Sequence, residues 1–172
     1  GEGEGEGEGE DEQLYCFEVI GCAVELCPGL EGDALNQCVS GVIFQCLNKV
    51  VSTAESNIFF EIYGQGGCMA SCQGLTEESD LYQCVRDNCI EEEAACFSGG
   101  QFGDGNCSGL RGCLQNCPVA TDGDCIRSCF NSSSESAAQF SVDLDYCLAA
   151  ECQTMSASGG DFESCAALAA GE

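Results

Sequence analysis

The chain has 172 residues and a formal net charge of −26, because 30 Asp and Glu stand against four Lys and Arg. This charge makes nucleic acid and anionic membrane poor partners, since both are negative, and it favours cations, basic proteins or basic glycans. The absence of histidine excludes Ser-His-Asp and Cys-His catalysis, histidine-containing zinc sites and Cys-x2-Cys-His haem attachment.

The 18 cysteines exceed the share, roughly 8–10%, that marks a disulfide scaffold. We therefore expect an oxidising compartment, with the protein extracellular, secreted or held at a cell surface. The chain begins at Gly1, as a mature product does after removal of a signal peptide, and it has no apolar run long enough to predict a membrane span. No two cysteines have Cys-x2-Cys or Cys-x-Cys spacing, so structural disulfides are favoured over redox or metal–thiolate sites.

Residues 1–13 form an acidic Gly-Glu tail of low complexity. Its composition buries no apolar surface, which favours a disordered acidic spacer. Strict alternation offers a second interpretation, because in an extended chain the five glutamates of residues 1–10 project from one face and the glycines from the other. The glycine face would then lie along a neighbouring subunit, with the carboxylates toward solvent or cations.

Beyond the tail, apolar residues recur at helical spacing and predict an all-α fold without strands. The first helix is expected to end at Cys27-Pro28-Gly29. A second helix is expected over residues 33–50, and its pattern allows an extension toward Tyr63. Residues 68–72 predict a short helical turn, and the next helix, capped at its start, carries one apolar stripe over residues 76–96.

The C-terminal half continues the helical pattern. A short helix is expected over residues 107–117, where Pro118 ends it, and another begins at Asp122-Gly-Asp124. Residues 131–134 read as a polar turn before a long amphipathic helix over residues 137–155. Asp161 predicts the start of a last short helix.

The cysteine spacing indicates an internal duplication. Cys16-x5-Cys22-x4-Cys27-Pro28 parallels Cys107-x5-Cys113-x3-Cys117-Pro118, and the cysteines from Cys68 to Cys96 parallel those from Cys125 to Cys165. The predicted organisation is a first cysteine-rich helical repeat with an inserted helix (14–97), a Gly-rich joint (98–106) and a second repeat (107–172). Each repeat holds an even number of cysteines, as closed disulfide sets require.

In each repeat, two helices are predicted to form a stapled hairpin, meaning two helices joined by two disulfides. The reason is that cysteines four or five residues apart share one helix face. The predicted bridges are Cys72–Cys84 with Cys68–Cys89, and Cys129–Cys147 with Cys125–Cys152. Two inserted cysteines lie two turns apart on one helix and cannot bridge each other, which leaves Cys38 and Cys46 to pair with Cys16, Cys22, Cys27 or Cys96.

Two resemblances follow from these motifs. Over Cys113 to Cys129, the paired cysteines resemble coiled-coil-helix proteins with twin Cys-x3-Cys motifs, in which paired helices are joined by two disulfides. In composition and in the helix-ending motif Cys27-Pro28-Gly29, the whole chain is similar to secreted bacterial cysteine-rich repeat proteins, which carry acidic, glycine-rich N-terminal tails. The resemblance implies an exported protein and no particular activity.

Acidic clusters are the candidate metal ligands, because calcium prefers hard oxygen donors. The candidates are Asp104, Asp122, Asp124, Asp143 and Asp145, although Asp-Gly is also a common turn signal and none continues into an EF-hand loop. No cofactor other than this calcium is predicted. Asn131 and Asn106 begin N-glycosylation sequons, and residues 91–93 read as a solvated acidic helix face.

The sequence favours a structural function over an enzyme. The leading hypothesis is an extracellular protein that self-assembles as a homo-oligomer or polymer, in a filament or surface layer, with divalent cations screening its charge. The alternative is a monomeric acidic secreted module that binds divalent cations or basic partners. A third hypothesis is a hydrolase with paired carboxylates, which the absence of tryptophan for sugar stacking disfavours.

Overall fold

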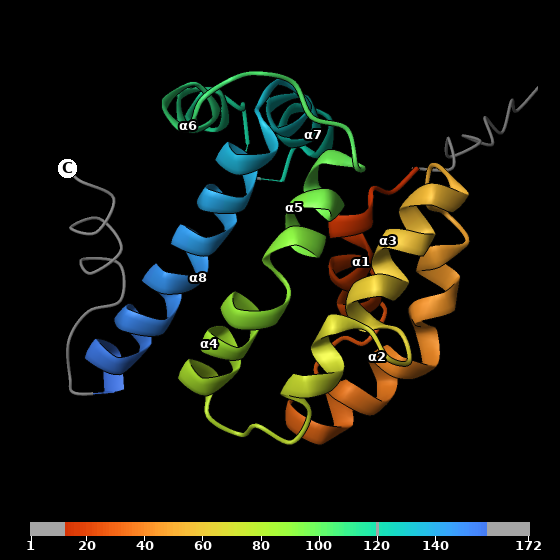
Figure 1. The fold of residues 1–172 in the computed structure, drawn as a ribbon. Helices are drawn as coiled ribbons and strands as arrows, with labels where there is room; N and C mark the ends of the chain where they lie inside the picture. Colours follow the sequence, from red (N-terminus) through yellow and green to blue (C-terminus); the bar gives the residue numbers. More distant parts are fainter. Residues whose placement is uncertain (1–12, 120, 158–172) are drawn as a thin grey trace, which may run out of the picture.

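The computed structural model describes residues 13–119 and 121–157, and within these ranges the chain is all-α, as predicted (Figure 1). The described residues form no strand; their β-type contacts are isolated bridges between Leu14 and Val50 and between Gly105 and Ser133. No helix in this part of the chain has the length and hydropathy needed to cross a bilayer. The elements in chain order are η1 (Cys16–Glu18), α1 (Val19–Glu25), α2 (Gly32–Leu47), α3 (Thr53–Tyr63), η2 (Cys68–Cys72), α4 (Glu78–Asn88), α5 (Ile90–Ser98), α6 (Cys107–Gln115), α7 (Gly123–Ser132) and α8 (Glu135–Ala157), where η denotes a 3-10 helix.

The helix expected from residue 33 does not run on toward Tyr63. It ends before residues 48–52, and Ser52, with an extended backbone, caps α3 by accepting a hydrogen bond from the Glu55 N–H at 3.3 Å. Leu14 exchanges backbone hydrogen bonds of 3.0 Å with the segment between the two helices. A continuous helix would use those backbone groups internally, so the break allows the N-terminal segment to dock there.

The stripe predicted over residues 76–96 is two helices rather than one. α4 ends at Asn88, α5 begins at Ile90, and Cys89 between them has φ −126° and ψ 5°. Cys89 is fully buried and is bridged to Cys68. The bridge holds this backbone position against η2, and the chain changes direction there into α5.

Three stapled hairpins organise the fold, each with an outer and an inner disulfide. In the hairpin of η2 and α4, the predicted bridges Cys68–Cys89 and Cys72–Cys84 are confirmed. The inserted cysteines pair within the predicted set and join α1 to α2 through Cys22–Cys46 and Cys27–Cys38. The third hairpin joins α6 to α7 through Cys113–Cys129 and Cys117–Cys125.

The predicted bridges Cys129–Cys147 and Cys125–Cys152 are wrong, because Cys129 is bound to Cys113 and Cys125 to Cys117. The link between α6 and α7 is short, so the two helices fold back antiparallel. The cysteine pair Cys113 and Cys117, spaced by one helical turn, then lies opposite the equally spaced pair Cys125 and Cys129. Among the described residues, Cys107 and Cys147 carry free thiols. The side chain of Cys152, the predicted helix with Cys165 and the tail of residues 1–12 lie outside the described part.

The cysteine pattern repeats in a different way from the one predicted. In the structure, Cys22 and Cys27 are bridged to the inserted α2, and their counterparts Cys113 and Cys117 are bridged to α7 in the same way. The α1–α2 hairpin is therefore the equivalent of the α6–α7 hairpin. The cysteines of α7 correspond to those of the inserted helix rather than to those of η2.

Two apolar clusters form the core, and α5 lies between them. One cluster is built from η1, α1, α2 and α3 with Cys96 of α5 and includes fully buried Ile62; the other is built from α5 to α8 and includes Phe130. Figure 1 shows α5 between α8 on one side and α1 and α3 on the other, with α6 and α7 across its end. The end of α5 is thus the place where both clusters meet.

Candidate functional site

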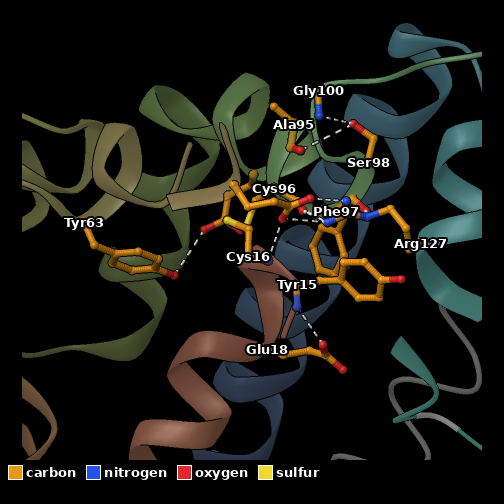
Figure 2. The surroundings of a disulfide bond; sticks show 12 residues. Tyr15, Cys16, Glu18, Tyr63, Ala95, Cys96, Phe97, Ser98, Gly100 and Arg127 are labelled. Carbon is orange, nitrogen blue, oxygen red and sulfur yellow. Dashed lines mark hydrogen bonds and ion pairs between the residues drawn. A yellow bond between two sulfur atoms is a disulfide. The ribbon is translucent and has the colours of Figure 1, made fainter. Parts of the chain in front are cut away.

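The junction at the end of α5 is built around a disulfide between distant parts of the chain. Cys16 of η1 is bound to Cys96 of α5 across 80 residues of sequence, and both residues are buried (Figure 2). In the chain-entropy model, closing a loop of this length stabilises the fold by about 4–5 kcal/mol. This bridge fixes the N-terminal segment against the centre of the molecule.

A buried ion pair lies beside this disulfide. Arg127 of α7 forms two charge-assisted hydrogen bonds with the carboxylate of Glu55 on α3, one of them between Nη2 and Oε2 at 2.9 Å. The guanidinium also donates to the carbonyls of Phe97 at 2.7 Å and Cys96 at 3.0 Å, at the C-terminal end of α5. The Cys16 N–H donates to Glu55 Oε2 at 2.8 Å. Each buried charge is therefore paired and hydrogen-bonded, as its burial requires.

Aromatic rings cover the ion pair. The Arg127 guanidinium carbon lies 4.3 Å from the centre of the Tyr15 ring and 5.7 Å from that of Phe17, within the range of a cation–π interaction. Stacked rings continue from Phe17 through Phe97 to Phe130, with centroids 5.1 and 4.8 Å apart. The stack joins η1, α5 and α7, so aromatic packing and the ion pair hold the same elements together.

Tyr15 connects this junction to the start of α7. Its hydroxyl donates to Asp124 at 2.6 Å, and this hydrogen bond raises the pKa of Tyr15. Gly99, the residue directly after α5, has a left-handed backbone, φ +66°. A Cβ at Gly99 would collide with the Arg127 guanidinium and the Glu55 carboxylate, so the ion pair is packed directly beneath the helix end.

A second buried carboxyl group lies one turn earlier on α5. Glu93 is 6% exposed, whereas the sequence indicated a solvated face. The Tyr63 hydroxyl donates to its carboxylate at 3.5 Å, and Tyr146 of α8 forms a further hydrogen bond. Burial raises the pKa of Glu93, and the two tyrosine hydrogen bonds offset part of that rise. Burial also raises the pKa of Tyr63 and of Tyr146.

Three of the five aspartates predicted as calcium ligands have other partners. Asp122 caps α7 by accepting from the Cys125 N–H at 3.0 Å, and Asp124 accepts the Tyr15 hydroxyl. Asp143 of α8 forms an ion pair with Arg86 of α4 at 2.9 Å. These carboxylates stabilise helix ends and helix contacts, and the structure does not bring them together.

The other two aspartates are also separate. Asp104 lies exposed in the loop before α6, and Asp145 lies on α8, where burial raises its pKa and the charge of Arg111 lowers it. Within the described ranges, the group of three candidate metal ligands with ligand atoms inside 4.8 Å consists of sulfurs in disulfides, those of Cys117, Cys125 and Cys129. The structure therefore assembles no carboxylate group of that kind from its described residues.

The two predicted glycosylation residues differ in their surroundings. Asn131 lies in the last turn of α7 rather than in a polar turn, and the amide orientation that satisfies its neighbours has its nitrogen donating to the carbonyls of Ser98 at 2.5 Å and Gln101 at 3.3 Å. Asn106 is exposed and caps α6 through its side-chain oxygen, at 2.9 Å from the Gly109 nitrogen. The cap uses the Asn106 oxygen and not the nitrogen that a glycan would occupy, whereas at Asn131 a glycan would replace an amide hydrogen that is used in a hydrogen bond.

The sequence reasoning missed Glu55, Arg127 and Gly99. Arg127 is one of four cations in a strongly acidic chain, which is the one signal that singles it out. Its partner is 72 residues away, and no spacing rule connects the two. Comparison with protein-family models, curated proteins and solved structures finds no match, so the geometry alone carries the functional argument.

Proposed function

We propose that the protein is an extracellular structural subunit that assembles with copies of itself into a filament or surface layer. The observation that carries this proposal is the distribution of its crosslinks. Three hairpins are each closed twice, over separations of 8 to 24 residues, and a seventh bridge closes 80 residues across the junction. Each bridge contributes about 2.5–4.5 kcal/mol in the chain-entropy model. Such dense covalent reinforcement, seven bridges among the described residues, is typical of a protein that must persist outside the cell.

Exposed apolar side chains supply candidate contact surfaces. Phe44 on α2 is 62% exposed, Phe140 on α8 is 56% exposed, and Val119 in the loop after α6 is 57% exposed. Assembly brings chains of charge −26 together, which requires counter-ions. In this proposal divalent cations, calcium among them, screen that repulsion between subunits.

Electron microscopy with light scattering tests the proposal. In millimolar calcium, the purified protein should form particles of uniform morphology, and a chelator should return them to monomers. A Phe140→Ser variant should assemble less well than a Thr121→Ser variant, which makes a small change outside the apolar surfaces. A wild-type protein that stays monomeric with and without calcium would overturn the proposal.

A second candidate is a monomeric acidic module for basic partners. It is favoured by one feature, a hollow at the end of α3 that is lined by carboxylates and an aromatic ring.

A further inference from the structure

A hollow of about 650 Å³ opens on the surface where α3 ends. It lies among α3, the turn of residues 64–67 that follows it, and the first turn of α5; we call it the α3 hollow. Its polar groups are two carboxylates and two amides, and one face is the ring of Phe60. Its lining includes Asn57, Phe60, Glu61, Gln65 and Glu92.

The turn of residues 64–67 gives the hollow a fixed backbone wall. Gly66 has a left-handed backbone, φ +80°, and a Cβ on Gly67 would lie 2.6 Å from the carbonyl oxygen of Ile62. The turn is therefore pressed against the last turn of α3, at a distance that only glycine permits. The bridge from Cys68 to Cys89 begins directly after it and holds it in place.

Phe60, which lines the hollow, also lies near an aromatic ring of α2. Phe60 is 43% exposed, and its ring centre lies 6.5 Å from that of Phe44, which is 62% exposed. Phe60 is thus a partly exposed ring in a lining that also holds carboxylates. An arginine or lysine side chain uses both features, because its apolar stem packs on a ring and its charged head pairs with a carboxylate.

The charged groups that line the hollow favour a cationic ligand. Glu61 and Glu92 line the hollow, and its described lining holds no Lys or Arg. The whole chain adds a net charge of −26. An anionic ligand meets two carboxylates of like charge there, whereas a basic segment meets complementary charge at short and long range.

We propose that the α3 hollow binds a basic segment of a partner protein, seating an arginine or lysine side chain with its stem on Phe60 and its charge toward Glu61 and Glu92. The site belongs to a single chain. It therefore does not depend on self-assembly and deepens the second candidate function.

The test uses the full-length protein as a monomer, in chelator and at ~150 mM salt, where repulsion and attraction between distant charges are screened. The probe is an acetylated and amidated peptide, Gly-Ser-Arg-Leu-Arg-Ser-Gly, titrated by calorimetry. Its control replaces both arginines with citrulline, which keeps the shape and removes the charge. The proposal predicts saturable binding of the arginine peptide with a stoichiometry of one, and at least about tenfold weaker binding of the citrulline peptide.

Matched variants assign the binding to the hollow. Glu61→Gln with Glu92→Gln should weaken binding at least about tenfold, and Phe60→Ala should weaken it as well. Glu31→Gln with Glu77→Gln removes the same charge at exposed positions outside the hollow, whose side chains form no cap hydrogen bond, and should change binding less than about twofold. Equal losses in the two double variants, or no binding by the wild type, would overturn the proposal. Either outcome is independent of whether the chains assemble in calcium.

Discussion

Replacement of Arg127 tests the junction at the end of α5 most sharply. Arg127→Met keeps most of the apolar volume of the side chain but removes the charge and every donor. Glu55 is then left buried without its partner, and the carbonyls of Cys96 and Phe97 lose their donor. The side chains of Arg127 and Glu55 are 10% and 5% exposed, so water replaces little of what is lost.

The magnitude follows from that burial. Removing one partner of a buried ion pair costs about 3–5 kcal/mol, because an uncompensated charge stays in the interior. The double variant Arg127→Met with Glu55→Gln removes this charge and should recover at least about 2 kcal/mol, since the amide still accepts from the Cys16 N–H. Arg86→Met is the matched control. Its pair with Asp143 is 25% and 39% exposed and should contribute no more than about 1 kcal/mol.

Urea unfolding of the oxidised protein, followed by far-ultraviolet circular dichroism, measures these differences. Urea is preferred because a charged denaturant would screen the ion pair. The reasoning is refuted if Arg127→Met costs no more than Arg86→Met, or if the double variant is less stable than Arg127→Met.

Three further predictions concern the same junction and its neighbours. Because the pKa of Glu93 is raised in the folded state, its contribution to stability is fully present below the unfolded pKa, near 4.5, and is lost as pH rises through the folded pKa. Glu93→Gln should therefore stabilise the protein relative to wild type more at pH 7 than at pH 4, as measured by urea unfolding. An equal difference at both pH values would contradict this. Gly99→Ala should destabilise the fold by at least about 2 kcal/mol, against about 1 kcal/mol for Gly29→Ala, whose backbone is also left-handed but whose Cβ meets open space, and equal shifts of the thermal midpoint would refute the close packing. Cys16→Ser with Cys96→Ser should cost about 4–5 kcal/mol and leave each hairpin bridged, whereas a loss below about 1 kcal/mol in urea would show that this closure contributes little.

Local spacing predicted the helices and one stapled hairpin, because helix faces and short loops are encoded by neighbouring residues. Cys68, Cys72, Cys84 and Cys89 pair as their one-turn spacing indicates. The error in the second repeat came from matching Cys125 and Cys129 to the wrong pair. Equal Cys-x3-Cys spacing and shorter loops favour closure with Cys113 and Cys117, and the resemblance to twin Cys-x3-Cys proteins already implied two bridges in this segment.

The junction itself could not be predicted from local pattern. Glu55 lies on a helix whose acidic residues look alike in sequence, and only the folded chain brings it to Arg127. The burial of Glu93 could not be predicted either, since the run of three consecutive glutamates gives no sign that the third faces two tyrosines. Tertiary contacts, not periodicity, decide which charges are buried.

Disulfide mapping of the native protein tests the central claim, that twelve of the cysteines form the six bridges of three stapled hairpins. Proteolysis under non-reducing conditions and at acidic pH, which suppresses thiol exchange, should yield the peptide pairs Cys113–Cys129 and Cys117–Cys125 beside the pairs of the other two hairpins. A peptide linking Cys129 to Cys147, or one linking Cys68 to Cys72, would contradict the account.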